Sequence, residues 1–300
     1  MRQAGLQTFV GATHPMDLGP DPLRVMALDE ELGFMPRIGK NEYYGLYGCV
    51  PNRYDVIDPG GRQRLLFIGD SVTHRGKIID GLKKLYGEED YEYWNAGVES
   101  FNTVQELALY RRYNRQIRPD HVILTFHNND FLQTPVAYRH EGQLHLGVPL
   151  SGNSSRWLIK NSALYRTYVL LTTSRTLVET DKVRQSLAEL KRAVEADGAK
   201  LSVVLLPIMA PTEQWKGLEQ ESREYSLQIL ASLNLPVYDL LGTLEKAISD
   251  GVPLEEIPGD IWHPSQELAD RFAEFLAAEG LLKPNGDNPN GPAEMVKTNP

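Results

Sequence analysis

The stretch RLLFIGDS, residues 64–71, decides the fold of this chain. Its apolar run ends at Gly69, as expected for a buried parallel strand. Asp70 and Ser71 follow directly, and a helix is predicted over residues 75–86, whose apolar side chains share one face. A buried strand, a short turn and an amphipathic helix form the first unit of an α/β domain.

The same alternation continues along the chain. Further strands are predicted at residues 91–94, 121–126, 201–206 and 236–240. Further helices are predicted from a capping box at Thr103 and Glu106, over 187–196, from Thr212 to about Leu233, and from Pro264-Ser265 onward. This order implies right-handed crossovers and a parallel sheet covered on both faces. The ligand site of such a sheet lies beyond the carboxyl ends of its strands.

Three segments depart from this pattern. Residues 1–60 are rich in Pro and Gly and are predicted to form an irregular extension packed on a core domain over 61–282. Within that domain, residues 131–161 are predicted to be a long irregular loop, whose aromatic side chains favour a lid or a pocket wall. Residues 283–300 are polar and rich in Pro, Gly and Asn, and are predicted to be disordered.

The bulk composition restricts the classes of function. A net charge of −9 over 300 residues disfavours a nucleic-acid partner, because phosphate contacts need clustered Lys and Arg. Cys49 is the single cysteine, so no disulfide can form within the chain. There is no run near the roughly 20 apolar residues of a membrane span, and no secretory signal is visible. A cytoplasmic protein is expected, although a chain trimmed of its leader would look the same.

Residues that could take part in catalysis follow three of the predicted strands. Ser71 could be a nucleophile at the start of a helix, with backbone N–H groups near a developing oxyanion, or it could be only an N-cap. Gly97 could be a turn glycine, and Asn129 could form an Asx turn. If the Gly97 N–H and the Asn129 amide point to one place, both would donate to an oxyanion.

An acid precedes a histidine by three residues in Asp260-Ile261-Trp262-His263. This spacing lets a carboxylate orient the imidazole and stabilise its charged form, as a catalytic triad requires. An Asp near a surface His is common, so the pair alone is a weak signal. Four signals, namely Ser71, Gly97, Asn129 and the Asp260–His263 pair, occur in order at one edge of the predicted sheet. Chance would have to produce all four together, so their combination favours a catalytic site.

Together these blocks resemble the SGNH hydrolase superfamily, also called GDSL esterases and lipases. The matching residues are Gly69-Asp70-Ser71, Gly97, Asn129-Asp130 and Asp260-x-x-His263, and the similarity covers about residues 33–282. The resemblance implies a flavodoxin-like three-layer α/β/α sandwich with a five-stranded parallel sheet. It also implies Ser71 as nucleophile, His263 as base, Asp260 as orienting acid, and an oxyanion hole from the Ser71 N–H, the Gly97 N–H and the Asn129 side chain.

One position departs from the family's pattern, because His127 stands where the third block usually has Gly. His127 could contact substrate or narrow the pocket, or the Gly could be dispensable. His74 and Phe131 are the other candidate substrate contacts, although a solvated surface position is the simpler interpretation of His74. Asp70 and Asp130 are predicted to hold the loops that aim Ser71 and Asn129.

The resemblance implies a serine hydrolase that cleaves carboxylic esters through an acyl-enzyme, without a cofactor. The histidines show no metal-ligand spacing. Short acyl or O-acetyl esters, on a small molecule or a carbohydrate, are the expected substrates by analogy. Two alternatives stay open: an O-acyltransferase with the same triad, and a non-catalytic carbohydrate-binding or scaffold protein. The oligomeric state is not predicted.

Overall fold

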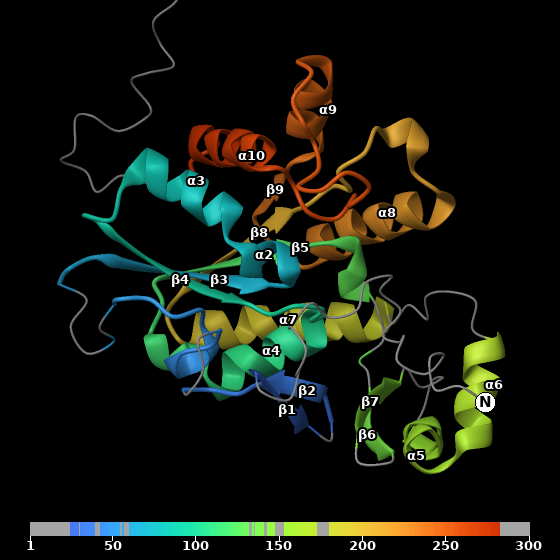
Figure 1. Cartoon of the computed structure of the whole chain (residues 1–300). Coiled ribbons are helices and arrows are strands. Elements are labelled where there is room, and N and C mark those ends of the chain that lie inside the picture. Colours follow the sequence, from blue (N-terminus) through green and yellow to red (C-terminus); the bar gives the residue numbers. More distant parts are fainter. Residues whose placement is uncertain are drawn as a thin grey trace, which may run out of the picture.

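A parallel sheet of five strands forms the centre of the molecule (Figure 1). The computed structural model describes residues 25–282 apart from 30, 40–42, 55, 57–59, 132–133, 135, 141–142, 148–152 and 173–179. The strands lie in the order β4 (Tyr91–Gly97), β3 (Gln63–Gly69), β5 (His121–Phe126), β8 (Lys200–Leu205) and β9 (Val237–Asp239). This is the strand order of flavodoxin-like sheets, and it confirms the predicted architecture.

Helices cover both faces of the sheet (Figure 1). One layer holds α4 (Thr103–Arg112), α7 (Thr180–Ala196) and α8 (Gly217–Ser232), and the other holds α3 (Lys77–Tyr86), α9 (Leu241–Ser249) and α10 (Gln266–Ala278). Successive side chains of a strand point to opposite faces. Leu66 and Ile68 of β3 therefore lie in the first core, while Leu65 and Phe67 lie in the second.

The segment before β3 is more regular than the irregular extension that the sequence predicts, in which only some short strands could form. It contains an antiparallel hairpin of β1 (Met26–Asp29) and β2 (Gly33–Pro36) and a short 3-10 turn, η2 (Leu46–Gly48). Phe34 packs against Phe101 with ring centroids 5.4 Å apart. Tyr44 and Cys49 are also buried in the core on the α4 side of the sheet. The described part of this segment is therefore packed on the domain.

The predicted irregular loop at 131–161 is another difference. It contains the antiparallel hairpin β6 (Val136–His140) and β7 (Gln143–Gly147), followed by α5 (Asn153–Asn161). Apolar and polar residues alternate on both sides of Glu141-Gly142, which is a hairpin pattern. Together with α6 (Ala163–Thr172), these elements lie between β5 and α7 in the sequence. They project from the core at the lower right of Figure 1. The predicted tail at 283–300 lies outside the described residues.

Two predicted helix starts are displaced in the structure. The helix predicted at 75–86 is divided at Gly76, with φ of 73°, into α2 (Ser71–Arg75) and α3. The capping box of α4 consists of Asn102 and Gln105, one residue before the predicted Thr103 and Glu106. Asn is at least as good an N-cap as Thr. As a result, the side chains of Thr103 and Glu106 are buried towards the core.

The region after β8 also differs from the prediction. The helix expected from Thr212 begins as a separate 3-10 turn, η5 (Thr212–Gln214), and α8 starts only at Gly217. Helix α9 was not predicted. Two further 3-10 turns, η3 (Asn114–Ile117) and η4 (Asn128–Phe131), flank β5. Over the residues that the structure describes, none of these helices has the length and apolar character that crossing a membrane requires.

A buried ion pair lies at the amino end of the sheet. The carboxylate of Glu92 is fully buried and accepts hydrogen bonds from Arg62 at 2.8 Å and from Trp94 Nε1 at 3.1 Å. Arg64 Nε lies 3.3 Å from the same carboxylate. Arg64 also donates to two backbone carbonyl groups, at 2.7 Å and 2.6 Å. The two arginines therefore compensate the buried charge of Glu92, and the carboxylate and two backbone carbonyl groups compensate that of Arg64.

Candidate active site

The end of β3 places Ser71 at the carboxyl edge of the sheet. Gly69 is required there, because a Cβ atom at this position would lie 2.2 Å from the Thr73 and Thr125 hydroxyls. The Asp70 side chain caps α2 by accepting a hydrogen bond from the Val72 N–H at 2.9 Å. Ser71 is the first residue of α2 and is partly exposed, and its N–H donates to no other residue that the structure describes.

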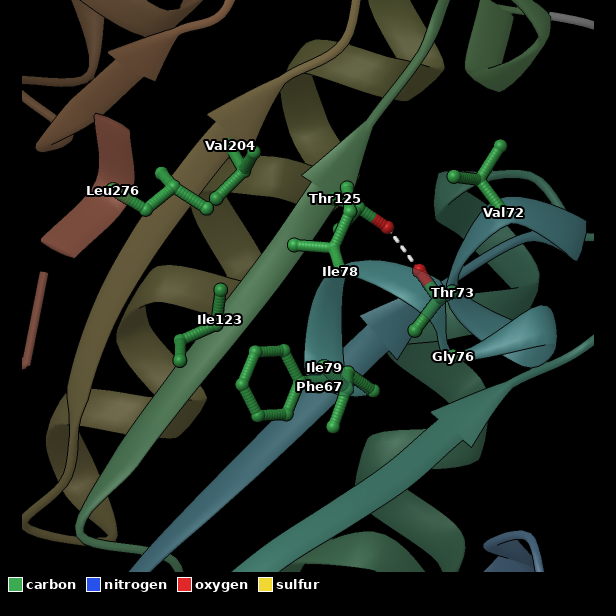
Figure 2. A pocket seen from close by; sticks show the side chains of 10 residues that line it. All are labelled: Phe67, Val72, Thr73, Gly76, Ile78, Ile79, Ile123, Thr125, Val204 and Leu276. Carbon is green, nitrogen blue, oxygen red and sulfur yellow. Dashed lines mark hydrogen bonds between the residues drawn. The ribbon is translucent and has the colours of Figure 1, made fainter. Parts of the chain in front are cut away.

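Two threonines attach α2 to the sheet. Figure 2 shows the hydrogen bond between the hydroxyls of Thr73 and Thr125 beneath this helix. A cavity of about 10 Å³ adjoins them, and its apolar lining includes Phe67, Val72, Ile78, Ile123, Val204 and Leu276 (Figure 2). This volume is near the minimum for one water molecule. The cavity is therefore too small to accept an acyl group.

Asn95 also holds α2 in place, from the end of β4. Its Nδ2 donates to the carbonyl oxygens of Thr73 at 2.8 Å and His74 at 3.1 Å. Its Oδ1 accepts from the Gly97 N–H at 2.9 Å. Asn95 is not among the residues predicted for the site, although an Asn two residues before the Gly at a strand end is a visible signal.

A chain of hydrogen bonds connects Ser71, His263 and Asp260. His263 Nε2 lies 2.8 Å from Ser71 Oγ, and His263 Nδ1 lies 2.7 Å from Asp260 Oδ2. His263 is buried, with 6% of its surface exposed. The structure thus brings together side chains that are 192 residues apart, in the order that the sequence predicted.

Backbone hydrogen bonds fix the loop that carries Asp260 and His263. The His263 carbonyl accepts from the Glu256 N–H at 3.0 Å, and the Ile261 carbonyl accepts from the Met209 N–H at 2.8 Å. The Asp260 carboxylate also accepts from the Trp262 N–H at 3.2 Å. Because both ends and the middle of the loop are bonded, the imidazole is held in one orientation.

A charged network surrounds Asp260. Arg75 Nη1 lies 3.8 Å from Asp260 Oδ2 and forms an ion pair with Glu256, which also pairs with Lys77 at 3.1 Å. Burial raises the pKa of Asp260, but the hydrogen bond with His263 and the charge of Arg75 outweigh this effect, so that the pKa is lowered overall. Asp260 is therefore ionised at neutral pH. Arg75 was not among the sequence-predicted site residues.

The predicted oxyanion donors have different surroundings. The Gly97 N–H is engaged by Asn95, and a Cβ atom at Gly97 would lie 2.2 Å from the His74 backbone nitrogen. Ser100 follows with a left-handed φ of 60°, and its N–H donates to no other described residue. Asn129 belongs to η4, but its side chain lies outside what the structure describes.

The three candidate substrate contacts are more buried than expected. His127 and Phe131 are each 1% exposed, so neither presents a free surface to a ligand. The His127 ring packs edge-on against Trp262, with centroids 5.4 Å apart. In place of the family's usual Gly, His127 thus fills space beside the His263 loop.

His74 retains partial exposure, unlike His127 and Phe131. Its Nδ1 lies 3.1 Å from the Gly97 carbonyl oxygen, and its ring lies beside Tyr44 with centroids 5.4 Å apart. Burial lowers the pKa of His74, so the ring is neutral at neutral pH. The solvated surface position considered from the sequence is therefore wrong for this residue.

Asp130 holds the turn that carries Asn129, as the sequence predicted. Its carboxylate accepts from the His127 N–H at 2.6 Å and from the Thr103 hydroxyl at 3.3 Å. The Asp130 N–H in turn donates to the His127 carbonyl at 3.1 Å. Across the described ranges, no three His, Cys, Asp or Glu side chains are arranged to hold a metal ion.

Comparisons with known proteins find similarity in structure only. No protein-family model matches the chain, and no characterised protein matches it in sequence. Axe2, an acetylxylan esterase from Geobacillus stearothermophilus, is similar with a TM-score of 0.51 and 16% identity, over 74% of this chain and 95% of the Axe2 chain. LAE5, an alpha/beta hydrolase enzyme from the metagenome of Lake Arreo in Spain, has the same TM-score and identity, over 74% of this chain and 97% of its own. These similarities show that the chain has an SGNH-like hydrolase fold.

Proposed function

We propose that this protein is a serine hydrolase that cleaves carboxylic esters with a short acyl group, such as O-acetyl esters. The observation that carries the proposal is the hydrogen-bond chain from Asp260 through His263 to Ser71, with distances of 2.7 Å and 2.8 Å. A hydroxyl bonded to an imidazole, which is oriented in turn by an ionised carboxylate, is the arrangement that activates a serine nucleophile.

The proposed reaction has two halves. Ser71 Oγ attacks the ester carbonyl carbon while His263 Nε2 takes the hydroxyl proton, and the imidazolium then gives this proton to the departing alcohol. Asp260 keeps the proton on Nδ1 and stabilises the imidazolium. Water next attacks the acyl-enzyme, with His263 again as base, and the carboxylic acid leaves as Ser71 is regenerated.

Backbone N–H groups near Ser71 would stabilise the oxyanion. The Ser71 N–H is a suitable donor, since it has no other partner among the described residues. We propose the Asn129 side chain as a second donor and an N–H of the 97–100 turn as the third. The Gly97 N–H would have to leave Asn95, whereas the Ser100 N–H has no such competitor. Loss of one donor typically lowers the rate by about 100–1,000-fold, which is the effect expected of Asn129→Ala.

The structural neighbours suggest which substrates to test first. Axe2 is an acetylxylan esterase, and its catalytic mutants include replacements of a serine and of an aspartate. The same residue types occur here in Ser71 and Asp260. Acetylated xylo-oligosaccharides are therefore the first carbohydrate esters to offer to this protein.

The test is hydrolysis of p-nitrophenyl acetate and butyrate by the wild type, Ser71→Ala and Ser232→Ala. Ser232 is an exposed serine at the end of α8, where it bonds only within its own helix, so it is a matched control. The wild type and the control should hydrolyse acetate faster than butyrate, and Ser71→Ala should lose about 10⁴-fold or more of kcat/KM. Equal slow rates in the wild type and Ser71→Ala would contradict the proposal.

Two further measurements separate the alternatives. Release of acetate in the presence of sugar acceptors distinguishes hydrolysis from acyl transfer, since a transferase passes the acyl group to the acceptor rather than to water. A phosphonofluoridate reagent should label Ser71 in the folded protein. Failure to label, together with absence of turnover, would favour a non-catalytic binding protein on this fold.

A further inference from the structure

Three carboxyl groups from three different elements lie close enough to one another to interact electrostatically. Asp70 caps α2, Asp130 belongs to η4, and Glu106 stands in the first turn of α4. All are buried, with 2%, 1% and 1% of their surfaces exposed. Neither Glu106 nor Asp130 forms an ion pair with a basic side chain in the part of the chain that the structure describes.

The two carboxyl groups of Glu106 and Asp130 differ in their hydrogen bonds. Asp130 accepts from the His127 N–H and the Thr103 hydroxyl, so donors stabilise its negative charge. Both oxygens of Glu106 are buried without a hydrogen-bond donor among the described groups. A buried carboxylate without donors is very unfavourable, and two carboxylates can bond to one another only if one carries a proton.

The electrostatic surroundings assign this proton to Glu106. Burial, followed by the charges of Asp130 and Asp70, raises the pKa of Glu106 well above its usual range. Burial and Asp70 also raise the pKa of Asp130, but hydrogen bonds from His127, Thr103 and Glu106 favour its charged form. Both effects favour one proton retained by the pair at a pH where ordinary carboxyl groups have lost theirs, and Glu106 is the better place for it.

We propose that Glu106 is a neutral carboxylic acid that donates a hydrogen bond to the Asp130 carboxylate, and that it is a positioning residue for the candidate active site. The proposal rests on the proposed function. Through Asp130 this bond links α4 to the η4 turn, which carries Asn129. Through Asp70 the same cluster adjoins the start of α2, which carries Ser71.

Ionisation of Glu106 would disturb both of these loops. It would place another negative charge beside Asp130 and Asp70, which follow the ends of β5 and β3. These strands pair directly, with Ile68 opposite Leu124. Repulsion would therefore act on the positions of Asn129 and Ser71, whereas the hydrogen bond between His263 and Asp260 lies outside the cluster.

The dependence on pH has a definite sign. Because the pKa of Glu106 is raised in the folded protein, its contribution to stability is fully present below the usual pKa of a glutamate. This contribution is lost as the pH rises through the raised pKa. The wild type should therefore lose both stability and kcat reversibly at alkaline pH. Glu106→Gln stays neutral and has an amide donor for Asp130, so it should lose neither.

The experiment compares the wild type with Glu106→Gln, Glu106→Leu and the control Glu92→Gln. At neutral pH, the infrared spectrum of the wild type should contain the carbonyl band of a protonated carboxylic acid, which Glu106→Gln lacks and Glu92→Gln retains. For p-nitrophenyl acetate, Glu106→Leu should lower kcat by about 10–100-fold with little change in KM, because the loops are displaced. Glu106→Gln should restore kcat and remove the alkaline decline.

Two results would overturn the proposal: the same infrared band in the wild type and Glu106→Gln, or the same alkaline decline in both. If Glu106→Leu does not fold, the Gln variant still decides the question. The infrared band needs no substrate, so it tests the proton separately from the esterase activity. A protein with the band but without turnover on any ester would overturn the proposed function and the positioning role while leaving the neutral Glu106 in place.

Discussion

The two ends of β3 hold buried charge in opposite ways. At the amino end, Glu92 is surrounded by the guanidinium groups of Arg62 and Arg64. At the carboxyl end, Glu106 and Asp130 are both buried and interact electrostatically, and we propose that a shared proton reconciles them. Along β3, residues 65–69 separate Arg64 of the first cluster from Asp70, which interacts with the second. A pair of opposite charges has no net charge over a wide pH range. A cluster of like charges, by contrast, is stable only while one member is protonated, and such clusters tend to occur at functional sites.

The comparison predicts that changes at the carboxyl end affect rate more than stability. Asp260→Asn gives the largest expected effect, a fall of about 10⁴-fold in kcat, because the amide no longer selects the imidazole tautomer that accepts the Ser71 proton. Glu256→Gln is the matched control, since the Glu256 side chain pairs with Arg75 and Lys77 and not with the His263 imidazole, and its backbone N–H is kept in the variant. Steady-state kinetics on p-nitrophenyl acetate measures both. Asp260→Asn with more than a tenth of wild-type activity would remove the proposed role of Asp260.

Changes at the amino end of β3 should affect stability more than rate. Glu92→Gln leaves Arg64 buried without its counter-charge, so it should lower the free energy of unfolding by about 3–5 kcal/mol while kcat stays near the wild-type value. Urea unfolding followed by circular dichroism measures the first quantity. Replacing both partners, as in Arg64→Met with Glu92→Leu, should recover most of the loss. A large fall in kcat for folded Glu92→Gln would break the distinction between the two ends.

A third prediction concerns the contact between β4 and α2. Gly97→Ala places a Cβ atom 2.2 Å from the His74 backbone nitrogen, so α2 must move together with Ser71. We expect a loss of about 1–3 kcal/mol in the free energy of unfolding and of about 10–100-fold in kcat. Gly217→Ala is the control, because a Cβ atom there meets nothing within 4 Å. Equal behaviour of the two variants would show that α2 tolerates the displacement.

The smallest expected effect is electrostatic. Arg75→Leu removes a positive charge near Asp260, so the pKa of that carboxyl should rise by less than about one unit in an NMR titration of the folded protein. Because the pKa of folded Asp260 is lowered, its stabilising contribution is present above the usual pKa of an aspartate and is lost as the pH falls through the lowered value. Lys84→Leu, which breaks a pair with Asp270 away from this site, should leave the pKa of Asp260 unchanged.

The strands of the central sheet could be predicted because burial on both faces produces continuous apolar runs. The predicted 121–126 strand matches β5 to the residue. Helix α9 could not be predicted in the same way, because its N-cap is Leu240, whose side chain cannot cap a helix. The hairpin of β6 and β7 is harder to predict, because its strands have only five residues each and their alternation lies within a polar segment.

The candidate site was only partly visible in the sequence. Ser71, Asp260 and His263 were selected because each follows a strand or precedes the last helix, and parallel strands share one carboxyl edge. Asn95, Arg75 and Glu106 were not selected as site residues. The sequence pattern predicts Glu106 as the acid of a capping box, but the structure has this capping box one residue earlier. Its burial depends on η4 and the start of α2, which are distant in sequence, and such packing cannot be derived from a local pattern.

The hydrogen bond between Ser71 and His263 has a consequence for biosynthesis. These residues are 192 positions apart, and the ribosome adds roughly 5–20 residues per second, so His263 is made about 10–40 s after Ser71. During that interval the nascent chain contains the proposed nucleophile without its base. A ribosome-bound chain that stops before His263 should therefore be inert towards esters, and hydrolytic capacity should begin only when translation has passed the histidine.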